Sequence, residues 1–157
     1  MKADVNNPVL RFPTADPTEA AAFFASRMTF QTDVSDVHAA LESGRLGFTL
    51  VDTRSESAWV QGHLPQAVHL PTDDIPRRAR EVLDPVTPVV TYCWGPGCNG
   101  STRVALLLSQ LGYRVKEMIG GYEYWVREGL PVQVGHDTRR VSADPLTVAP
   151  GTLSCRC

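Results

Sequence analysis

The chain has 157 residues, of which 43% are hydrophobic and 20% are charged, and its formal net charge is −2. These values fit one packed globular domain and exclude wholesale disorder. The sequence contains no basic run of the kind that binds nucleic acid, and no apolar run near the roughly 20 residues that cross a bilayer. We therefore expect neither nucleic acid nor a membrane as a partner.

The first residues and the cysteines indicate the cellular compartment in which we expect the protein. Residues 1–8 lack the apolar stretch of a signal peptide, so a cytoplasmic location with mostly reduced cysteines is the default expectation. The four cysteines form two pairs, Cys93 with Cys98 and Cys155 with Cys157. One residue between Cys155 and Cys157 is tight for structural zinc, whose ligands usually lie about two to four residues apart. We expect no metal and no other cofactor.

The N-terminal part is predicted to be an arm followed by a helix. Residues 1–15 show little periodicity, whereas Asp16 can cap a helix that Pro17 begins. Apolar residues then recur at helical spacing, at Ala20, Phe23, Phe24 and Met28. We expect residues 1–32 to form an arm and a helix whose apolar face packs on the domain that follows.

Strands and helices are predicted to alternate through the rest of the chain. Short runs rich in β-formers predict strands at residues 48–52, 67–70, 89–92 and 114–119. Amphipathic segments predict helices at residues 35–43, 55–61, 74–83, 101–111 and 122–128. Such alternation is typical of an α/β domain with a mainly parallel sheet and helices on both faces. We place this domain at residues 33–134 and a tail at residues 135–157.

The segment after the strand at 89–92 carries the strongest chemical signal. Cys93 stands at the carboxyl end of that strand, where parallel sheets collect functional groups. The loop after it, up to the helix start, comprises Trp94, Gly95, Pro96, Gly97, Cys98, Asn99, Gly100 and Ser101. Its glycines allow backbone N–H groups to point inward, and the helix adds its positive end. We therefore expect the pKa of Cys93 to fall below about 8.5; the simpler alternative is a buried cysteine beside an ordinary turn.

Four segments in this order resemble the rhodanese-like sulfurtransferase family. They are Val51-Asp52-Thr53-Arg54, Gly62-His63-Leu64-Pro65-Gln66-Ala67, the loop from Tyr92 to Ser101, and Ile119-Gly120-Gly121-Tyr122-Glu123-Tyr124-Trp125. The resemblance implies a rhodanese-like fold and a Cys93 that accepts sulfane sulfur and holds it as a persulfide. It also implies a small sulfur-containing anion or thiol as substrate, and it allows a protein as acceptor.

The loop departs from the common family pattern. With Ser101 aligned, the loop is two residues longer, and Gly100 stands where the family has an arginine. Longer loops in this fold resemble those of cell-cycle phosphatases and arsenate reductases, which gives a second hypothesis. A cysteine phosphatase needs an arginine six residues after its nucleophile, and that position is Asn99. A third hypothesis is a non-catalytic persulfide carrier or sensor.

Several residues keep two interpretations. Cys98 is either a functional thiol, which attacks a Cys93 persulfide or protects Cys93 from overoxidation, or a passive cysteine whose sulfur points away. Arg54 either guides an anionic substrate or joins a structural ion pair with Asp52, which would also cap the next helix. The Cys155/Cys157 pair either reaches the active site or has no role at the terminus.

Overall fold

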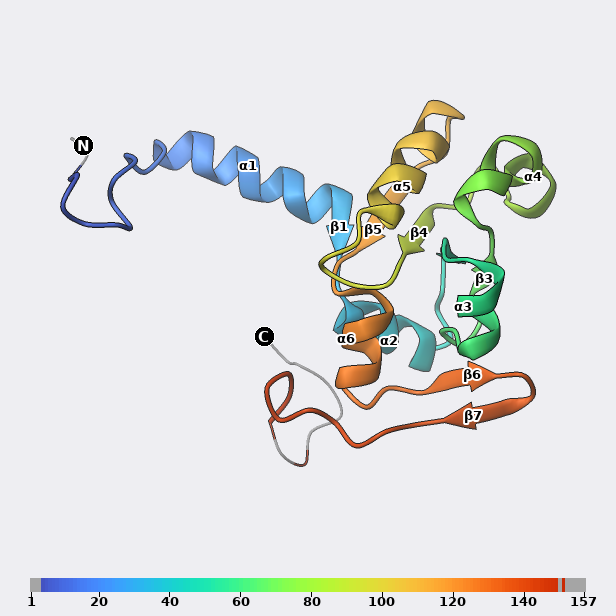
Figure 1. Ribbon diagram of the computed structural model, residues 1–157. Helices are drawn as coiled ribbons and strands as arrows, with labels where there is room; N and C mark the ends of the chain where they lie inside the picture. Colours follow the sequence, from blue (N-terminus) through green and yellow to red (C-terminus); the bar gives the residue numbers. More distant parts are fainter. Residues whose placement is uncertain (1–3, 150, 152–157) are drawn as a thin grey trace. The chain divides into compact units, whose positions relative to one another are not determined.

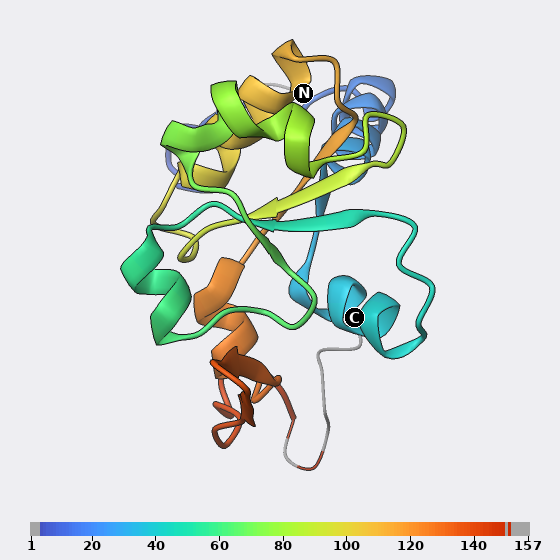
Figure 2. The same ribbon diagram turned by 90° about the vertical axis from the view of Figure 1, so that its right-hand side faces the viewer.

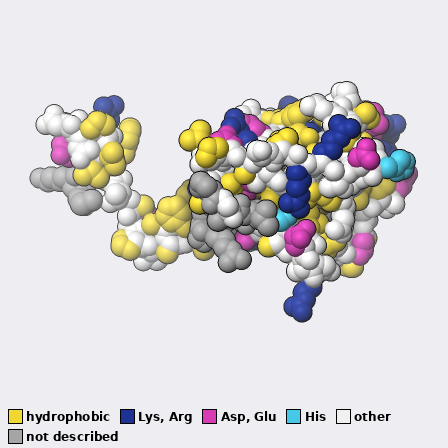
Figure 3. Space-filling model, turned by 90° about the horizontal axis from the view of Figure 1, so that it is seen from below, with side chains coloured by type: hydrophobic (Ala, Val, Ile, Leu, Met, Phe, Trp, Pro, Cys, Tyr) yellow, Lys and Arg dark blue, Asp and Glu magenta, His cyan; other side chains and the backbone are white. Residues whose placement is uncertain are grey.

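The first unit of the chain is an arm and a single helix. The computed structural model describes residues 4–149 and 151, and it divides into two compact units with the boundary after Phe30. Helix α1 (Pro17–Phe30) begins as predicted, and the side chain of Asp16 accepts the N–H of Thr18 at 2.8 Å. No residue of α1 is buried, and hydrophobic side chains lie on the surface of this unit (Figure 3). Packing of α1 on the domain therefore stays a prediction.

The second unit contains a five-stranded parallel sheet. Its strands are β1 (Gln31–Thr32), β2 (Thr49–Asp52), β3 (Val68–His69), β4 (Val89–Tyr92) and β5 (Val115–Met118) (Figure 1). The strand order is β1-β5-β4-β2-β3, and every neighbouring pair is parallel. This confirms the predicted α/β fold with a parallel sheet. β1 was not predicted, because two polar residues carry no strand pattern.

All the predicted helices of this unit are present. They are α2 (Val34–Glu42), α3 (Glu56–Gln61), α4 (Ile75–Val82, after the 3₁₀ turn η1 at Thr72–Asp74), α5 (Gly100–Gln110) and α6 (Gly121–Arg127). Helices α2 and α6 lie on one side of the sheet, and α4 and α5 lie on the other (Figure 2). Both faces of the sheet are therefore covered, as a parallel sheet requires.

The two faces of the sheet alternate along each central strand. In β2, Leu50 packs with α2 and α6, whereas Val51 packs with α4 and α5. In β4, Val90 and Tyr92 join the first core and Val89 joins the second. Because β4 is the middle strand and is buried along its whole length, its carboxyl end is held from both sides. Cys93 follows directly.

The end of the domain differs from the prediction. Strands β6 (Val132–Val134) and β7 (Asp137–Arg139) form an antiparallel hairpin, so the segment expected to begin a tail is partly ordered. Gly135 turns the chain with φ +59°. The hairpin is tied to the domain where His63 and Gln133 exchange backbone hydrogen bonds of 3.0 and 2.8 Å. Polar residues dominate β7, which is why no apolar pattern indicated a strand.

Candidate active site

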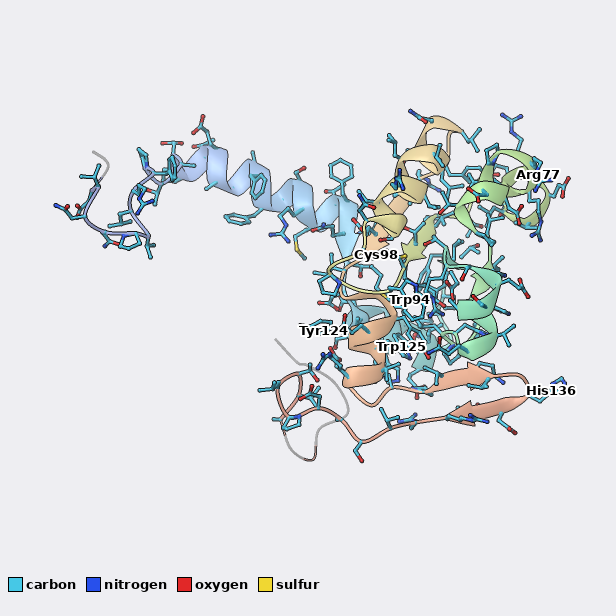
Figure 4. The ribbon with its side chains drawn as sticks, viewed as in Figure 1. Arg77, Trp94, Cys98, Tyr124, Trp125 and His136 are labelled. Carbon is cyan, nitrogen blue, oxygen red and sulfur yellow. The ribbon has the colours of Figure 1, made fainter. Side chains whose placement is uncertain are left out.

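The loop between β4 and α5 brings both of its cysteines to one place. Cys93 is buried and Cys98 is partly exposed, and both are free thiols. Their sulfur atoms lie 2.9 Å apart, within hydrogen-bonding distance. Figure 4 marks Trp94 and Cys98 on this loop. The alternative in which Cys98 points away from Cys93 is thus wrong for this structure.

The start of α6 holds the loop in its curled shape. The N–H of Tyr122 donates to the carbonyl oxygen of Cys93 at 2.9 Å, and the N–H of Glu123 donates to that of Trp94 at 2.7 Å. Within the loop, the N–H of Cys98 donates to the carbonyl oxygen of Gly95 at 3.0 Å. The amides of Trp94 and Gly100 are then the N–H groups of the loop that bond the sulfur atoms.

Gly121 makes this contact between α6 and the loop feasible. Its φ is +60°, and a β-carbon there would lie 2.6 Å from the carbonyl oxygen of Cys93 and 2.9 Å from the amide nitrogen of Gly95. Both atoms belong to the backbone and cannot rotate away. The second glycine of the Gly120-Gly121 pair is therefore required by the active-site loop, a role that the sequence alone did not assign.

Gly100 gives the sulfur atoms their space. It is the first residue of α5, and a β-carbon there would lie 2.6 Å from the Cys93 sulfur and 3.4 Å from the Cys98 sulfur. The absence of a side chain leaves room beside Cys93 and brings the helix start close to both sulfur atoms. The positive end of α5 then favours negative charge at this position. At position 100 the backbone itself, and no side chain, therefore lies against the Cys93 sulfur.

The two thiols ionise as a pair, and the expectation for Cys93 needs correction. Burial raises the pKa of the Cys93 thiol, and the contact with Cys98 raises it further, while the Trp94 amide and the Thr53 hydroxyl act in the opposite direction. For Cys98, partial burial opposes ionisation, but hydrogen bonds from Cys93 and from the amides of Gly100 and Trp94 outweigh it and lower its pKa.

The prediction of a lowered pKa at Cys93 itself is therefore wrong in the free dithiol. The amide groups favour a thiolate, whereas the second thiol, which the sequence does not place beside Cys93, opposes it at Cys93. Across the 2.9 Å contact, the thiol that keeps its proton can donate a hydrogen bond to the thiolate of the other. Because the two groups are coupled, the lowered first step and the raised second step belong to the pair.

Arg54 is held in a buried ion pair below the loop. Its Nη2 lies 2.7 Å from Oδ2 of Asp52, and both side chains are completely buried. The same nitrogen donates to the carbonyl oxygen of Gly62 at 2.6 Å, and Tyr92 donates its hydroxyl to Asp52 at 2.6 Å. The structural ion pair is thus observed. The helix cap is Ser55, whose side chain accepts the N–H of Ala58, so the prediction of Asp52 as the cap is wrong.

Aromatic rings cover the rest of the Arg54 guanidinium. Its central carbon lies 4.0 Å from the ring centre of Tyr122 and 4.7 Å from that of Trp94. Nη1 is buried and has no hydrogen-bond acceptor among the described residues. The Arg54 guanidinium therefore packs against the ring of Trp94. Guidance of an incoming anion would require this side chain to leave its buried position.

Other loop residues are more exposed. Trp94, Pro96, Gly97 and Asn99 lie on the surface, whereas Gly95 packs against Glu123. At the start of α5, Ser101 is buried and donates its hydroxyl to Glu117 at 2.6 Å, which anchors the helix. Thr53 lies beside Cys93, which sequence analysis did not foresee: its hydroxyl donates to the carbonyl oxygen of Tyr92 at 2.8 Å and acts to lower the pKa of Cys93. It follows β2 directly, and that position at the end of a neighbouring parallel strand could have indicated it.

The fold and a cysteine at the end of the middle strand define a class of protein. Residues 33–128 match the Rhodanese-like domain family. Since this match covers more than half of the 157 residues, the chain belongs to the rhodanese-like domain family.

Individual relatives agree with this assignment. A sulfurtransferase from Allochromatium vinosum is 35% identical over 103 residues, which cover 63% of this chain and 94% of that protein. The thiosulfate sulfurtransferase GlpE of Actinobacillus pleuropneumoniae serotype 5b is 31% identical over 90 residues, 57% of this chain and 82% of that protein. The crystal structure of BH2092 protein from Bacillus halodurans has a TM-score of 0.72 at 37% identity and covers 75% of this chain and 86% of that one.

A different kind of protein shares the same domain. The HTH-type transcriptional regulator Rv0324 of Mycobacterium tuberculosis is 31% identical over 87 residues, 55% of this chain. This chain spans only 38% of the length of that regulator.

Two further observations concern the described residues alone. Among them, no helix is both long and apolar enough to span a bilayer. Cys155 and Cys157, for which the sequence left two roles open, lie outside the described residues.

Proposed function

We propose that this chain is a sulfurtransferase that moves sulfane sulfur from a donor such as thiosulfate to a thiophilic acceptor through a persulfide on Cys93. The supporting observation is the position of the Cys93 sulfur at the end of β4, in close contact with the backbone of Gly100 at the start of α5. The proton shared by the two thiols moves to Cys98, and the Cys93 thiolate attacks the outer sulfur of the donor. The donor's S–S bond breaks, and sulfite leaves with the electron pair. An acceptor nucleophile then attacks the new outer sulfur and releases the Cys93 thiolate.

Backbone groups would stabilise the anions of this reaction. No residue from Trp94 to Thr102 is a lysine or arginine, and Arg54 is buried. Arg103 lies one turn into α5 and is exposed. The loop therefore offers a donor the start of α5 and the inward amides in place of a guanidinium. This arrangement suits a small donor, an anion or a persulfide, that the site recognises mainly at its reacting sulfur.

The test is intact-mass measurement of the protein after incubation with thiosulfate or inorganic polysulfide. With Cys98 replaced by serine, so that nothing else in the loop can consume the persulfide, the mass should rise by one sulfur atom. Cys93→Ser should abolish this gain. Multiple turnover is then measured as thiocyanate formed from cyanide. A protein that loads sulfur but transfers none to cyanide or a thiol would be a carrier, the non-catalytic hypothesis.

The phosphatase and arsenate-reductase hypothesis predicts a different result. Phosphate binding in a cysteine phosphatase relies on bidentate contacts from an arginine. The corresponding residue, Asn99, has an exposed side chain and precedes α5 without capping it. We expect hydrolysis of an aryl phosphate to be negligible. Phosphatase or arsenate reductase turnover that depends on Cys93 and exceeds sulfur transfer would reverse this ranking.

A further inference from the structure

The second thiol of the loop has no task in simple sulfur transfer. Transfer through Cys93 needs one sulfur nucleophile, yet Cys98 is held 2.9 Å from it. The N–H of Cys98 is fixed by the carbonyl oxygen of Gly95, in a turn that brings the Cys98 side chain back toward Cys93. Gly100 leaves space at both sulfur atoms, since a β-carbon there would contact each of them. The loop is therefore built around two sulfur atoms.

We propose that Cys98 is a resolving residue that converts the Cys93 persulfide into hydrogen sulfide and a Cys93–Cys98 disulfide, so that this domain also acts as a sulfane-sulfur reductase. This inference rests on the proposed function, because it begins from the Cys93 persulfide. The acceptor in this reaction is a residue of the loop itself. An external thiol reductant, such as a low-molecular-weight thiol or a dithiol protein, then restores the two thiols and completes the cycle.

The step balances without any other reagent. The outer sulfur of the persulfide takes the proton of the pair, and the Cys98 thiolate attacks the Sγ atom of Cys93. The new Sγ–Sγ bond forms as the bond between Cys93 and the outer sulfur breaks, and HS⁻ leaves with the electron pair. The two cysteine sulfur atoms are oxidised to a disulfide, and the sulfane sulfur is reduced to sulfide.

Distance favours attack on the inner sulfur. A disulfide bond is about 2.0 Å long, so the sulfur atoms need to approach by roughly 1 Å from their present separation of 2.9 Å. Two of the residues between the cysteines are glycines, Gly95 and Gly97, and a β-carbon at Gly97 would meet nothing within 4 Å, so this side of the loop has room to adjust. The outer sulfur lies one further bond away from Cys93. The amides of Gly100 and Trp94 act to lower the pKa of Cys98 and do not depend on the Cys93 thiol, so they favour the thiolate that the attack requires.

The experiment is a single turnover without reductant. The full-length protein receives one equivalent of thiosulfate, whose leaving group is sulfite, so that any sulfide must come from the persulfide; released sulfide and intact mass are followed together. For the wild type we expect close to one equivalent of sulfide and a protein that has lost two hydrogen atoms, with the disulfide mapped to Cys93 and Cys98 in peptides. Replacement of Cys155 and Cys157 by serine controls for the other thiols, and it should not change this result.

Cys98→Ser separates this proposal from the proposed function. The variant should still gain one sulfur atom on Cys93, because the first attack uses Cys93 alone, and it should release less than a tenth of the wild-type sulfide. Failure of this variant to gain sulfur would contradict the proposed function. A wild type that gains sulfur, keeps it as a persulfide on Cys93 or Cys98, and releases no sulfide would overturn the resolving role and leave sulfur transfer intact. Cys98→Ala, as a second variant, guards against a specific defect of serine.

Discussion

The backbone of Gly100 approaches the Cys93 sulfur so closely that a β-carbon at position 100 would lie 2.6 Å from it. This contact couples the start of α5 to the reactive atom, and it explains why the loop carries no side chain at this position. An alanine would have to displace the sulfur or shift the first turn of the helix. Either change would alter the position of the sulfur atom that attacks the donor.

The first prediction follows from this contact. Gly100→Ala should slow sulfur loading of Cys93 by about ten- to a hundredfold, because a displacement of about 1 Å at a reacting atom can cost that much. Intact-mass kinetics after addition of polysulfide would measure the rate. Gly97→Ala is the matched control in the same loop, since a β-carbon there would meet nothing within 4 Å, and its effect should be clearly smaller. Equal losses in the two variants would show that the loop, and not this contact, is sensitive.

The second prediction concerns ionisation of the thiol pair. In the wild type, alkylation by iodoacetamide should follow two steps with pH, the first below and the second above the value of an ordinary cysteine. A lower pKa means more thiolate at neutral pH, so Cys98 should be labelled first in peptide maps. The separate steps arise because, after the first thiol ionises, the remaining thiol donates a hydrogen bond to the thiolate and loses its own proton less readily.

Single substitutions should merge these steps. In Cys98→Ala, the pKa of Cys93 should fall relative to the upper step, because burial still raises it but the contribution of Cys98 is gone. In Cys93→Ala, the pKa of Cys98 should rise, because its main stabilising hydrogen bond is lost. Unchanged profiles in both variants would mean that the sulfur atoms do not share a proton in solution.

The sequence predicts the frame of this site better than its chemistry. Apolar runs and glycines predicted the positions of β4, the loop and α5, because apolar residues indicate burial and glycines indicate backbone freedom. The proximity of Cys98 to Cys93 depends on a turn closed by one backbone hydrogen bond, and the burial of Arg54 depends on rings from distant segments. Neither can be derived from spacing, and the two-residue strand β1 and the polar strand β7 are missed because pairing with a neighbouring strand creates them.

The third prediction concerns the buried ion pair. Arg54→Met should reduce the free energy of unfolding by about 3–5 kcal/mol, because Asp52 would be left buried without its partner. The exposed Arg127, which pairs with Glu123 and Asp144, provides the comparison. Arg127→Met should cost much less than Arg54→Met, since water screens exposed pairs. Urea denaturation of both variants would measure the difference, and similar costs would indicate that water reaches Asp52 in solution.

The last prediction tests how α6 holds the active-site loop. Gly121 has φ +60° and Gly135 has φ +59°, so alanine suffers the same backbone penalty of about 1–2 kcal/mol at either position. Their surroundings differ, because a β-carbon at Gly135 would meet nothing within 4 Å, whereas one at Gly121 would collide with the backbone of Cys93 and Gly95. Gly121→Ala should therefore lose roughly 3 kcal/mol or more in free energy of unfolding, and Gly135→Ala only the backbone penalty.

Sulfur loading should differ more between Gly121→Ala and Gly135→Ala than the free energy of unfolding does. To fit alanine at position 121, the loop must retreat and lose the hydrogen bonds that Tyr122 and Glu123 donate to the carbonyl oxygens of Cys93 and Trp94. The amide groups around the sulfur atoms would then lose their orientation. Sulfur loading should be abolished in Gly121→Ala at a temperature where circular dichroism shows the protein still folded, and it should be normal in Gly135→Ala. Normal loading in a folded Gly121→Ala protein would mean that the Cys93 loop keeps its shape without α6.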